Sequence, residues 1–511
     1  MEKTEIKFGT DGWRGVIAED FTFDNVRRVA QATADYWNTI VGRASRLPSG
    51  RAGDVTPAGE TPALRNTGIV GYDNRFLSEV YAKLVCEVLA ANGIKAFYPP
   101  VAPPTPAVSY AVRDRKLCGA VMITASHNPP QFNGYKVKAE FAGPADPEIC
   151  SQIEKRIDQS PVRSVSFDDA VHTGAIEIYD PRPAHIAAVK KIVDLKKIRN
   201  ARLKVIVDSM HGCGGTVLEE IVGQPSWLRR GKGRASWKLA LQTIRATRNP
   251  LFGGVNPEPI GKNLGALCDA VKKSRADIGL ATDGDADRMG VVDDKGRYVS
   301  IQLVFAMLLL HLVRNRGKTN GVVVKSANCT VLIDRICRAH GLQCAEVPVG
   351  FKYICAKMRE TDVLIGGEES GGMGFQGHIP ERDGILANLM LLEMLATTKK
   401  SVTQIVADLQ KEFGKSAYDR IDMHYPLEQR GKLIETLRRD PPRALLGSPL
   451  AEMKDFDGVK YVAEDDSWLM FRASGTEPII RIYSEAASAT RVQRLLEWGK
   501  SRAMMIATSS P

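Results

Sequence analysis

Short, almost continuous runs of valine, isoleucine and leucine recur along this chain, and most are followed by a loop and a helix-like stretch. Arg202–Met210 reads RLKVIVDSM, and Gly321–Gly341 reads as a strand, a loop and a helix that ends at its glycine. Strands that are apolar on both faces and alternate with helices predict parallel or mixed sheets with helices on both sides. In such sheets ligands bind at loops beyond the carboxyl ends of strands, so these loops are the candidate sites.

The chain is too long for a single hydrophobic core. Its 511 residues predict about three or four domains of ordinary size. Shifts in pattern near Pro183, Ile301 and Tyr418 mark candidate boundaries. The predicted domains are 1–183, 184–301, 302–417 and 418–511. Gly42–Gly68 interrupts the pattern with glycine, proline, serine, threonine and arginine, and predicts a flexible surface loop.

The composition predicts a cytoplasmic protein that binds neither membranes nor nucleic acids. No apolar secretory segment begins the sequence, and the longest apolar run, Leu303–Val313, is shorter than the roughly 20 residues of a membrane span. The nine cysteines contain no C-x-x-C pair and predict reduced thiols. The net charge of +11 is dispersed, and the basic Ser226–Lys238 segment predicts a surface loop, with weak nucleic-acid binding as the alternative. No coiled coil is visible, so monomer and homodimer both stay open.

The first candidate site follows the apolar segment CGAVMI, which predicts a buried strand. Thr124–Lys136 then reads TASHNPPQFNGYK. A serine hydroxyl presented after a strand can act as a nucleophile or carry a phosphoryl group, which makes Ser126 the candidate. His127 and Lys136 could move protons for it. The alternative is a polar turn that only ends the strand.

The second candidate site is DGDADR, where aspartates alternate with other residues at Asp283, Asp285 and Asp287. Three carboxylates around one centre are hard oxygen ligands, which suit Mg²⁺ or Ca²⁺. A calcium-binding EF-hand would need glycine in place of Arg288, glutamate in place of Asp294, and flanking helices. Because the flanks read as strands, we reject the EF-hand. A plain acidic turn is disfavoured because the three charges would repel one another.

Two further loops offer groups for a sugar and a phosphate. GGEESGGMG contains Glu368 and Ser370, which could bind sugar hydroxyls, although a plain glycine-rich turn explains it equally well. RASGTEPIIRIYSE groups arginines, hydroxyls and backbone N–H groups that could bind a phosphate dianion. Its candidate residues are Arg472, Ser474, Gly475, Thr476 and Arg481. Together the four loops supply what phosphoryl transfer on a phosphosugar requires.

These motifs, in this order, resemble those of the α-D-phosphohexomutases. FGTDGWRG (Phe8–Gly15) is similar to the N-terminal active-site segment of that family, and VGFKYI (Val349–Ile354) is similar to its third-domain loop. The resemblance covers residues 8 to about 485. It implies an α/β fold of four domains around a central cleft: three related mixed-sheet α/β domains and a smaller C-terminal α+β domain.

The resemblance also implies a role for each candidate residue. Ser126 would be phosphorylated and would bind Mg²⁺ together with Asp283, Asp285 and Asp287. Arg14 and Arg288 would steady the phosphoryl group, while His127 and Lys136 would transfer protons. The residues that would bind the sugar phosphate are Lys352, Glu368, Ser370, Arg472, Ser474, Gly475, Thr476 and Arg481.

The activity implied is the interconversion of hexose 1-phosphate and hexose 6-phosphate. The phosphate would pass through phosphoserine and a hexose 1,6-bisphosphate, with glucose 1,6-bisphosphate as activator or intermediate. GEESGG resembles the glucose and mannose enzymes more than the GEQSGH form of the glucosamine branch, so glucose is favoured and mannose is a second substrate. A phosphoglucosamine mutase and a non-catalytic phosphosugar-binding protein are the alternatives.

Overall fold

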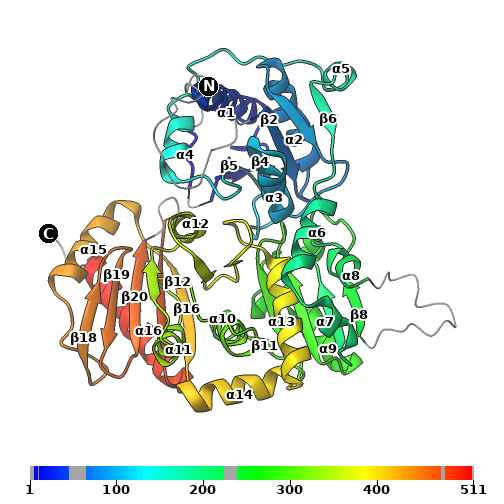
Figure 1. Ribbon diagram of the computed structural model, residues 1–511. Coiled ribbons are helices and arrows are strands. Elements are labelled where there is room, and N and C mark those ends of the chain that lie inside the picture. The colour runs from blue at the N-terminus through cyan, green and yellow to red at the C-terminus, as the bar shows by residue number, and fades with distance from the viewer. Residues whose placement is uncertain (1–4, 10, 45–64, 224–238, 474–477, 509–511) are drawn as a thin grey trace, which may run out of the picture.

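The computed structural model describes residues 5–9, 11–44, 65–223, 239–473 and 478–508. Within them the chain forms four sheets that follow one another along the sequence (Figure 1). The first three sheets mix parallel and antiparallel strands, and the fourth is antiparallel throughout. The predicted fold class of three mixed α/β domains and a C-terminal α+β domain is therefore confirmed.

The first sheet has six strands in the order β1-β5-β4-β2-β3-β6. Its strands are β1 (Trp13–Val16), β2 (Arg65–Tyr72), β3 (Lys95–Tyr98), β4 (Leu117–Ile123), β5 (Phe132–Ala139) and β6 (Ile176–Ile178). The helices of this part are α1 (Phe23–Ala44), α2 (Ser78–Ala91), α3 (Thr105–Arg115), α4 (Pro147–Glu154) and α5 (Phe167–His172). All of β4 is buried, as the apolar segment CGAVMI predicts.

The second sheet has five strands in the order β11-β10-β9-β7-β8. Its strands are β7 (Lys204–Asp208), β8 (Ala240–Ile244), β9 (Ile278–Thr282), β10 (Met289–Val292) and β11 (Tyr298–Val299). The accompanying helices are α6 (Arg182–Ile192), α7 (Leu195–Asn200), α8 (Val217–Val222), α9 (Gly265–Ser274) and the short η2 (Phe252–Gly254) and η3 (Gly261–Asn263).

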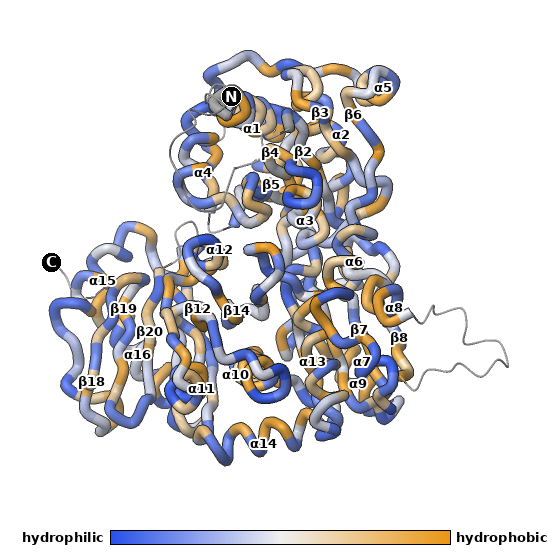
Figure 2. Tube along the Cα trace, in the orientation of Figure 1, coloured by the Kyte–Doolittle hydropathy of each residue, from blue (hydrophilic) through white to orange (hydrophobic). Residues whose placement is uncertain are grey.

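The third sheet has four strands in the order β13-β12-β14-β15. Its strands are β12 (Val322–Ser326), β13 (Cys344–Val347), β14 (Val363–Gly367) and β15 (Met373–Phe375). Its helices are α10 (Ile301–Leu310), the π turn η4 (His311–Asn315), α11 (Leu332–His340), α12 (Phe351–Glu360), α13 (Gly384–Thr398) and α14 (Val402–Phe413). Figure 2 shows polar and apolar residues alternating along α14, whose buried face repeats at Val402, Ile405 and Leu409.

The fourth sheet has six strands in the order β16-β21-β20-β19-β18-β17. Its strands are β16 (Ala417–His424), β17 (Ala444–Leu445), β18 (Ser448–Lys454), β19 (Val459–Ala463), β20 (Trp468–Ala473) and β21 (Ile479–Ala486). Its helices are η5 (Leu427–Gln429), α15 (Arg430–Arg439) and α16 (Ala489–Thr508). Glu485 of β21 joins this part to the third, because it accepts hydrogen bonds from the Thr330 hydroxyl and from Val331 N.

The same hairpin recurs in the first three sheets. In each, a strand that pairs in parallel with one neighbour is followed by an antiparallel partner: β4 by β5, β9 by β10, and β14 by β15. The loops within these hairpins carry the serine, aspartate and glutamate motifs, respectively. The three sheets therefore place their candidate residues at equivalent positions, although the sequence shows no repeat.

The structure tests the two predicted surface loops, Gly42–Gly68 and Ser226–Lys238, only in part. The predicted loop Gly42–Gly68 is wrong at its ends, because α1 continues to Ala44 and β2 begins at Arg65. Gly68 lies within β2, where an added Cβ would stand 2.4 Å from the Trp37 ring, so close packing rather than a turn explains this glycine. The middle of that segment and the basic Ser226–Lys238 segment lie outside the described residues.

The predicted domain boundaries fall close to the starts of elements. Pro183 lies in α6, Ile301 begins α10 and Tyr418 is the second residue of β16. All nine cysteines belong to the described part of the chain and are free thiols, as predicted. Among the helices that the structure describes, none combines the length and hydropathy needed to cross a bilayer.

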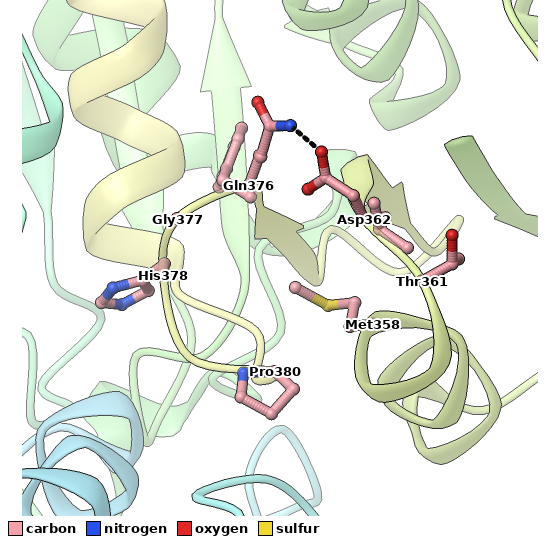
Figure 3. A pocket seen from close by; sticks show the side chains of 9 residues that line it. Met358, Thr361, Asp362, Gln376, Gly377, His378 and Pro380 are labelled. Atoms are coloured by element: carbon pink, nitrogen blue, oxygen red, sulfur yellow. Dashed lines mark hydrogen bonds between the residues drawn. The ribbon is translucent and has the colours of Figure 1, made fainter. Parts of the chain in front are cut away.

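A buried group of two histidines and one aspartate fixes the start of α13. Asp383 Oδ1 accepts hydrogen bonds from Ile385 N and Leu386 N, and Asp383 Oδ2 contacts His185 Nε2 at 2.6 Å and His378 Nε2 at 3.0 Å. The 2.6 Å separation is that of a hydrogen bond, since two ligands of one tetrahedral zinc ion stand roughly 3.3 Å apart. Figure 3 shows the His378 ring at one side of a small hollow, turned away from the Gln376–Asp362 hydrogen bond.

We expect the folded state to lose stability as the pH falls below neutrality. Burial lowers the pKa of His378 below its usual value of 6.5, even though Asp383 opposes this. The unfolded chain therefore takes up the proton first. The stabilisation is complete above about pH 6.5 and is lost as the pH falls toward the lower pKa of the folded state, by at most about 1.4 kcal/mol per pH unit.

Urea unfolding of the wild type between pH 7.5 and 5.5 tests this expectation. In the His378→Gln variant the slope of the free energy of unfolding against pH should become shallower. The matched control is His172→Gln, since His172 is exposed on α5 and its loss should leave the slope unchanged. Equal slopes in wild type and His378→Gln would contradict the assignment.

Candidate active site

Ser126 lies in the β4–β5 loop and reaches the loop of a different sheet. Its side chain is buried, and its Oγ donates a hydrogen bond to Asp283 Oδ2 at 2.8 Å. The backbone of Ser126 is left-handed, with φ of 53°. A non-glycine residue seldom adopts this conformation unless its surroundings hold it there. The structure thus brings together the two strongest candidates from the sequence.

The aspartate loop between β9 and β10 turns sharply and aims three carboxylates at one point. One oxygen from each of Asp283, Asp285 and Asp287 lies within 4.8 Å of the others, and all three residues are buried. Ala286 at the tip has φ of 59°, and Arg288 N donates to Asp283 Oδ1 at 3.1 Å. The flanking strands confirm that the loop is not an EF-hand.

Two helix starts hold this loop from outside. Thr105 N, in the first turn of α3, donates to the backbone oxygen of Asp285 at 2.9 Å. Gly384 N, which begins α13, donates to the backbone oxygen of Ala286 at 3.2 Å. The positive ends of two helices therefore lie beside the aspartates, where they favour negative charge. The His185–His378–Asp383 group supports the aspartate loop indirectly. Asp383 caps the N-terminus of α13, and Gly384 at that terminus donates the hydrogen bond to Ala286.

The serine loop and the aspartate loop approach so closely that only glycine fits between them. A Cβ on Gly284 would stand 2.5 Å from the backbone oxygen of Ser126. We expect Gly284→Ala to lower the free energy of unfolding by roughly 1–3 kcal/mol and to reduce activity, because the two loops must separate. Chemical denaturation and an activity assay on the same sample measure both effects.

Gly265→Ala is the matched control for that substitution. Gly265 is exposed in the first turn of α9, and no atom stands within 4 Å of where its Cβ would lie. Alanine there should leave the free energy of unfolding unchanged or raise it by up to about 1 kcal/mol. If both variants behaved alike, the close approach at Gly284 would have no consequence.

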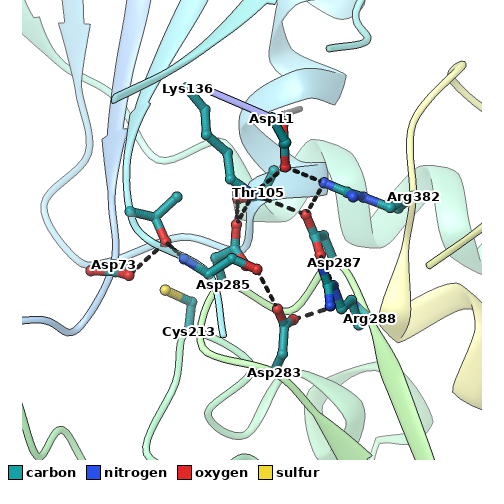
Figure 4. Close-up of polar contacts among 12 residues, drawn as sticks. Asp11, Asp73, Thr105, Lys136, Cys213, Asp283, Asp285, Asp287, Arg288 and Arg382 are labelled. Carbon is teal, nitrogen blue, oxygen red and sulfur yellow. Dashed lines mark hydrogen bonds and ion pairs between the residues drawn. The ribbon is translucent and has the colours of Figure 1, made fainter. Parts of the chain in front are cut away.

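Two buried cations cross-link the aspartates to the N-terminal segment. Lys136 Nζ on β5 lies 2.9 Å from Asp285 Oδ2, 3.2 Å from Asp287 Oδ2 and 2.9 Å from Asp11 Oδ2. Arg382 Nη2 lies 2.5 Å from Asp11 Oδ2 and 2.7 Å from Asp287 Oδ2 (Figure 4). Thr105 Oγ1 also donates to Asp285 Oδ2, at 2.7 Å. All of these contacts to Asp285 and Asp287 are made through Oδ2, and Oδ1 of neither residue takes part in them.

The pKa values of Asp283 and Asp285 are shifted in opposite directions. Burial raises the pKa of Asp283 well above its usual value, and the facing carboxylates of Asp285 and Asp287 raise it further. Burial also acts to raise the pKa of Asp285, but Lys136 and Thr105 outweigh it and bring that pKa below the usual value. Burial lowers the pKa of Lys136, yet the neighbouring carboxylates outweigh burial and raise it overall. Without a cation, the Asp283 carboxyl therefore holds its proton more readily than a free aspartate does, because its charged form would be buried beside two other carboxylates.

His127, which follows Ser126 in the chain, lies close enough to Arg14 and Arg288 to be affected by their charges. Burial lowers the pKa of His127 well below its usual value, and the positive charges of Arg288 and Arg14 lower it further. His127 Nδ1 is buried and has no hydrogen-bond partner among the described residues. Arg14 Nη1 donates to Asn128 Oδ1 at 2.6 Å, and Arg288 Nε lies 3.8 Å from Asp287 Oδ1.

The glutamate loop of the third sheet joins the aspartate loop directly. Met289 N donates to the backbone oxygen of Gly371 at 3.0 Å. Glu368 is buried, and its Oε2 accepts a hydrogen bond from Arg382 Nη1 at 3.3 Å. Ser370 is half-buried in the same loop, and Lys352 is half-buried in the first turn of α12. Arg382 thus contacts residues of the N-terminal, aspartate and glutamate segments at once.

The phosphate motif is described only in part. Arg472 on β20 and Arg481 on β21 are direct cross-strand partners. Arg472 Nε lies 3.0 Å from Asp457 Oδ2, and Arg481 Nε lies 3.8 Å from Asp422 Oδ2. Two arginines opposite each other repel, which favours an anion between or above them. Ser474, Gly475 and Thr476 lie outside the described residues.

Sequence reasoning missed four side chains of this site. Arg382 and Thr105 were not singled out, although both follow the ends of strands. Asp11 belongs to the FGTDGWRG motif, but no role was assigned to it. Arg75 was missed as well, and it lies directly beneath the serine loop. For Arg75, Thr105 and Arg382 the only signal in the sequence was a charged or polar residue that follows a strand by a few positions.

Comparison with known proteins identifies the family. Models of the phosphoglucomutase/phosphomannomutase family match the chain in four parts: alpha/beta/alpha domain I at residues 53–163, domain II at 183–296, domain III at 302–413 and the C-terminal domain at 433–497. These matches follow the four sheets of the structure in order.

Full-length relatives support the same assignment. A phosphoglucomutase/phosphomannomutase of Thermococcus kodakarensis is 28% identical over 96% of this chain and 97% of its own. A Thermococcus gammatolerans protein, provisionally named phosphoglucosamine mutase, is 28% identical over 96% of each chain. A solved structure from Thermus thermophilus, named as a candidate phosphomannomutase, is 34% identical with a TM-score of 0.78 and covers 98% of this chain and 99% of its own. The chain therefore belongs to the phosphoglucomutase/phosphomannomutase family of phosphohexomutases.

Proposed function

We propose that the protein interconverts hexose 1-phosphate and hexose 6-phosphate, with glucose as its preferred sugar and mannose as a second. Phosphorylated Ser126 and a hexose 1,6-bisphosphate would carry the phosphate. One observation supports this most strongly: the Ser126 hydroxyl lies 2.8 Å from Asp283, inside a cluster of three aspartates contributed by another sheet. A serine so placed is next to a site for the cation that phosphoryl transfer requires.

The aspartate cluster fits Mg²⁺. Asp285 Oδ1 and Asp287 Oδ1 are buried, and neither has a hydrogen-bond partner among the described residues. Buried carboxylate oxygens without a donor are costly unless a cation binds them. Asp283, Asp285, Asp287 and an oxygen on Ser126 would hold the ion, in keeping with its preference for oxygen ligands. Bound Mg²⁺ would neutralise charge that develops on the transferring phosphoryl group.

The residues around Ser126 supply positive charge and proton transfer. Arg14 and Arg288 would bind oxygens of the phosphoryl group. His127 and Lys136 stay our candidates for proton transfer. The lowered pKa of His127 suits it to accept the proton of the attacking sugar hydroxyl, whereas the raised pKa of Lys136 keeps it protonated, as a donor toward the leaving oxygen. Asp11 and Arg382 would hold Lys136 and Asp287 in place.

The reaction balances without any outside reactant. The bond between phosphorus and Ser126 Oγ breaks as a bond forms between phosphorus and the free hydroxyl of a hexose phosphate. The sugar hydroxyl gives up its proton, and Ser126 Oγ takes one up. The resulting bisphosphate turns over within the site. Its other phosphate then returns to Ser126, and the sugar oxygen left behind regains a proton. Hexose 1-phosphate and hexose 6-phosphate thus exchange while the protein ends as it began.

The remaining motifs would hold the sugar during this exchange. Glu368 and Ser370 would bind ring hydroxyls, with Lys352 nearby. The distal phosphate would be bound by Arg472, Ser474, Gly475, Thr476 and Arg481. Because the two arginines face each other across β20 and β21, they offer one anion site that can accept either phosphate of the bisphosphate.

Glucosamine is the alternative sugar, since several full-length relatives are provisionally named for it. A loop that contacts neighbouring hydroxyls need not distinguish glucose from mannose, which differ at C2. We favour glucose because the loop reads GEESGG rather than GEQSGH. A non-catalytic binding protein is disfavoured, because Ser126 and all three aspartates are present.

A coupled assay on the purified protein tests the proposal. Glucose 1-phosphate, mannose 1-phosphate and glucosamine 1-phosphate are compared with Mg²⁺ and a trace of the matching 1,6-bisphosphate. We expect turnover that EDTA abolishes, with the highest kcat/KM for glucose 1-phosphate. A higher value for glucosamine 1-phosphate would reassign the sugar. No turnover with any of the three would overturn the proposed activity on these sugars.

A further inference from the structure

Arg75 lies beneath the serine loop and gives every side-chain N–H to it or to one neighbouring carboxylate. The guanidinium is fully buried. Nη1 donates to the backbone oxygens of Pro129 at 2.7 Å and Phe132 at 3.0 Å, and Nη2 donates to those of Ser126 at 2.8 Å and Asn128 at 2.6 Å. Four carbonyl oxygens of a single loop therefore point at one side chain that does not touch the Ser126 hydroxyl.

A closed ring of hydrogen bonds includes both backbone groups of Ser126. Arg75 Nε donates to Asp73 Oδ2 at 3.1 Å, and the Thr124 hydroxyl donates to the same oxygen at 2.6 Å. Ser126 N donates to Thr124 Oγ1 at 2.8 Å, while the Ser126 backbone oxygen accepts from Arg75. The peptide groups on both sides of Ser126 are thus fixed through Arg75, Asp73 and Thr124.

This ring holds Ser126 in a conformation that it would otherwise seldom adopt. The φ of 53° is left-handed, and the Pro129–Pro130 pair that follows supplies no N–H group to satisfy the loop from within. Carbonyl oxygens that converge in a buried place need a donor. A planar guanidinium can serve four of them at fixed angles, whereas a lysine ammonium has only three protons.

Arg75 also connects the serine loop to the second domain. The Phe252 ring centre lies 5.0 Å from the guanidinium carbon, and Arg248, from the same domain as Phe252, donates to the backbone oxygens of Asn74 and Arg75. The flat face of the Arg75 guanidinium is therefore covered by Phe252, which belongs to the same domain as the three aspartates. Docking of the two domains and orientation of the serine share this one side chain.

We propose that Arg75 is a positioning residue that selects the left-handed conformation of Ser126, the one in which Oγ faces Asp283. This inference rests on the proposed mutase function. Arg75 acts through the backbone, so its loss should slow transfer of the phosphoryl group and leave binding of the sugar phosphate intact. Misplacement of a reacting group by about 1 Å can cost about 100-fold in rate.

The test compares Arg75→Lys with Arg248→Lys as the matched control. Arg248 contacts Glu79 and the backbone of Asn74 and Arg75 but not the serine loop, so its variant should behave like the wild type. For Arg75→Lys we expect kcat to fall by about 30- to 100-fold with KM within about threefold of wild type. The rate of Ser126 phosphorylation by glucose 1,6-bisphosphate should fall equally. A crystal structure should show Ser126 away from positive φ.

Chemical rescue separates positioning from a merely structural role. Arg75→Ala leaves a guanidinium-shaped space, so millimolar guanidinium chloride should raise its kcat at least about fivefold, while methylammonium chloride at equal ionic strength should not. If Arg75→Ala does not fold, Arg75→Lys decides the matter alone. An Arg75→Lys protein with wild-type kcat, or with loss only in KM, would overturn the inference. A wild type without turnover would instead overturn the proposed function.

Discussion

Replacement of Ser126 by alanine is expected to remove mutase turnover and leave the fold intact. We expect kcat to fall by about 10⁴-fold or more, as in other enzymes that lose a catalytic nucleophile. The hydroxyl is the only side-chain group lost, and among the contacts of the described residues its side-chain hydrogen bond is to Asp283. Steady-state kinetics with glucose 1-phosphate, Mg²⁺ and glucose 1,6-bisphosphate measure the effect.

The fold of the Ser126→Ala protein should be close to that of the wild type. Backbone groups, not the hydroxyl, make the contacts to Arg75 and Thr124. Its melting temperature is therefore expected to stay near that of the wild type. Ser164→Ala is the matched control, since Ser164 is exposed between α4 and α5. Substantial turnover in a folded Ser126→Ala protein would remove Ser126 from the mechanism.

Replacement of Asp285 by asparagine is expected to weaken Mg²⁺ binding and slow turnover. The substitution removes one negative charge from the cluster and disturbs the oxygen held by Lys136 and Thr105. We expect the Mg²⁺ concentration for half-maximal activity to rise at least about tenfold and kcat at saturation to fall by about 100-fold. Magnesium titrations of the initial rate, after removal of metal with EDTA, measure both quantities.

Asp269→Asn is the matched control for the metal titration. Asp269 is exposed on α9, so the variant loses the same charge away from the cluster. Its titration should superimpose on that of the wild type. An unchanged magnesium titration for Asp285→Asn would show that the ion binds elsewhere. Equal shifts in both variants would point to a general effect of net charge.

The fold and the centre of the site could be predicted because both depend on local sequence. An apolar strand followed by a polar motif marks each hairpin loop, and three alternating aspartates need no partner from elsewhere to suggest a metal. Ser126 and Asp283 were therefore identified separately. That they touch could not be derived from spacing, since 157 positions separate them.

The supporting side chains could not be predicted because their partners are distant in the chain. Arg382 and Asp11 are 371 positions apart, and Arg75 serves carbonyl oxygens up to 57 positions away. Every residue has a backbone oxygen, so no sequence pattern indicates that four of them converge on the Arg75 guanidinium. Gly68 shows the opposite error, since a glycine needed for packing against Trp37 was interpreted as part of a loop.

The most direct test of the proposed mechanism is to locate the phosphate on the protein. The purified wild type is incubated with glucose 1,6-bisphosphate and Mg²⁺, digested, and mapped by tandem mass spectrometry. We predict a single phosphate on Ser126, which disappears when excess glucose 6-phosphate is added. A protein that takes up no phosphate, or carries it on a residue other than Ser126, would contradict the mechanism.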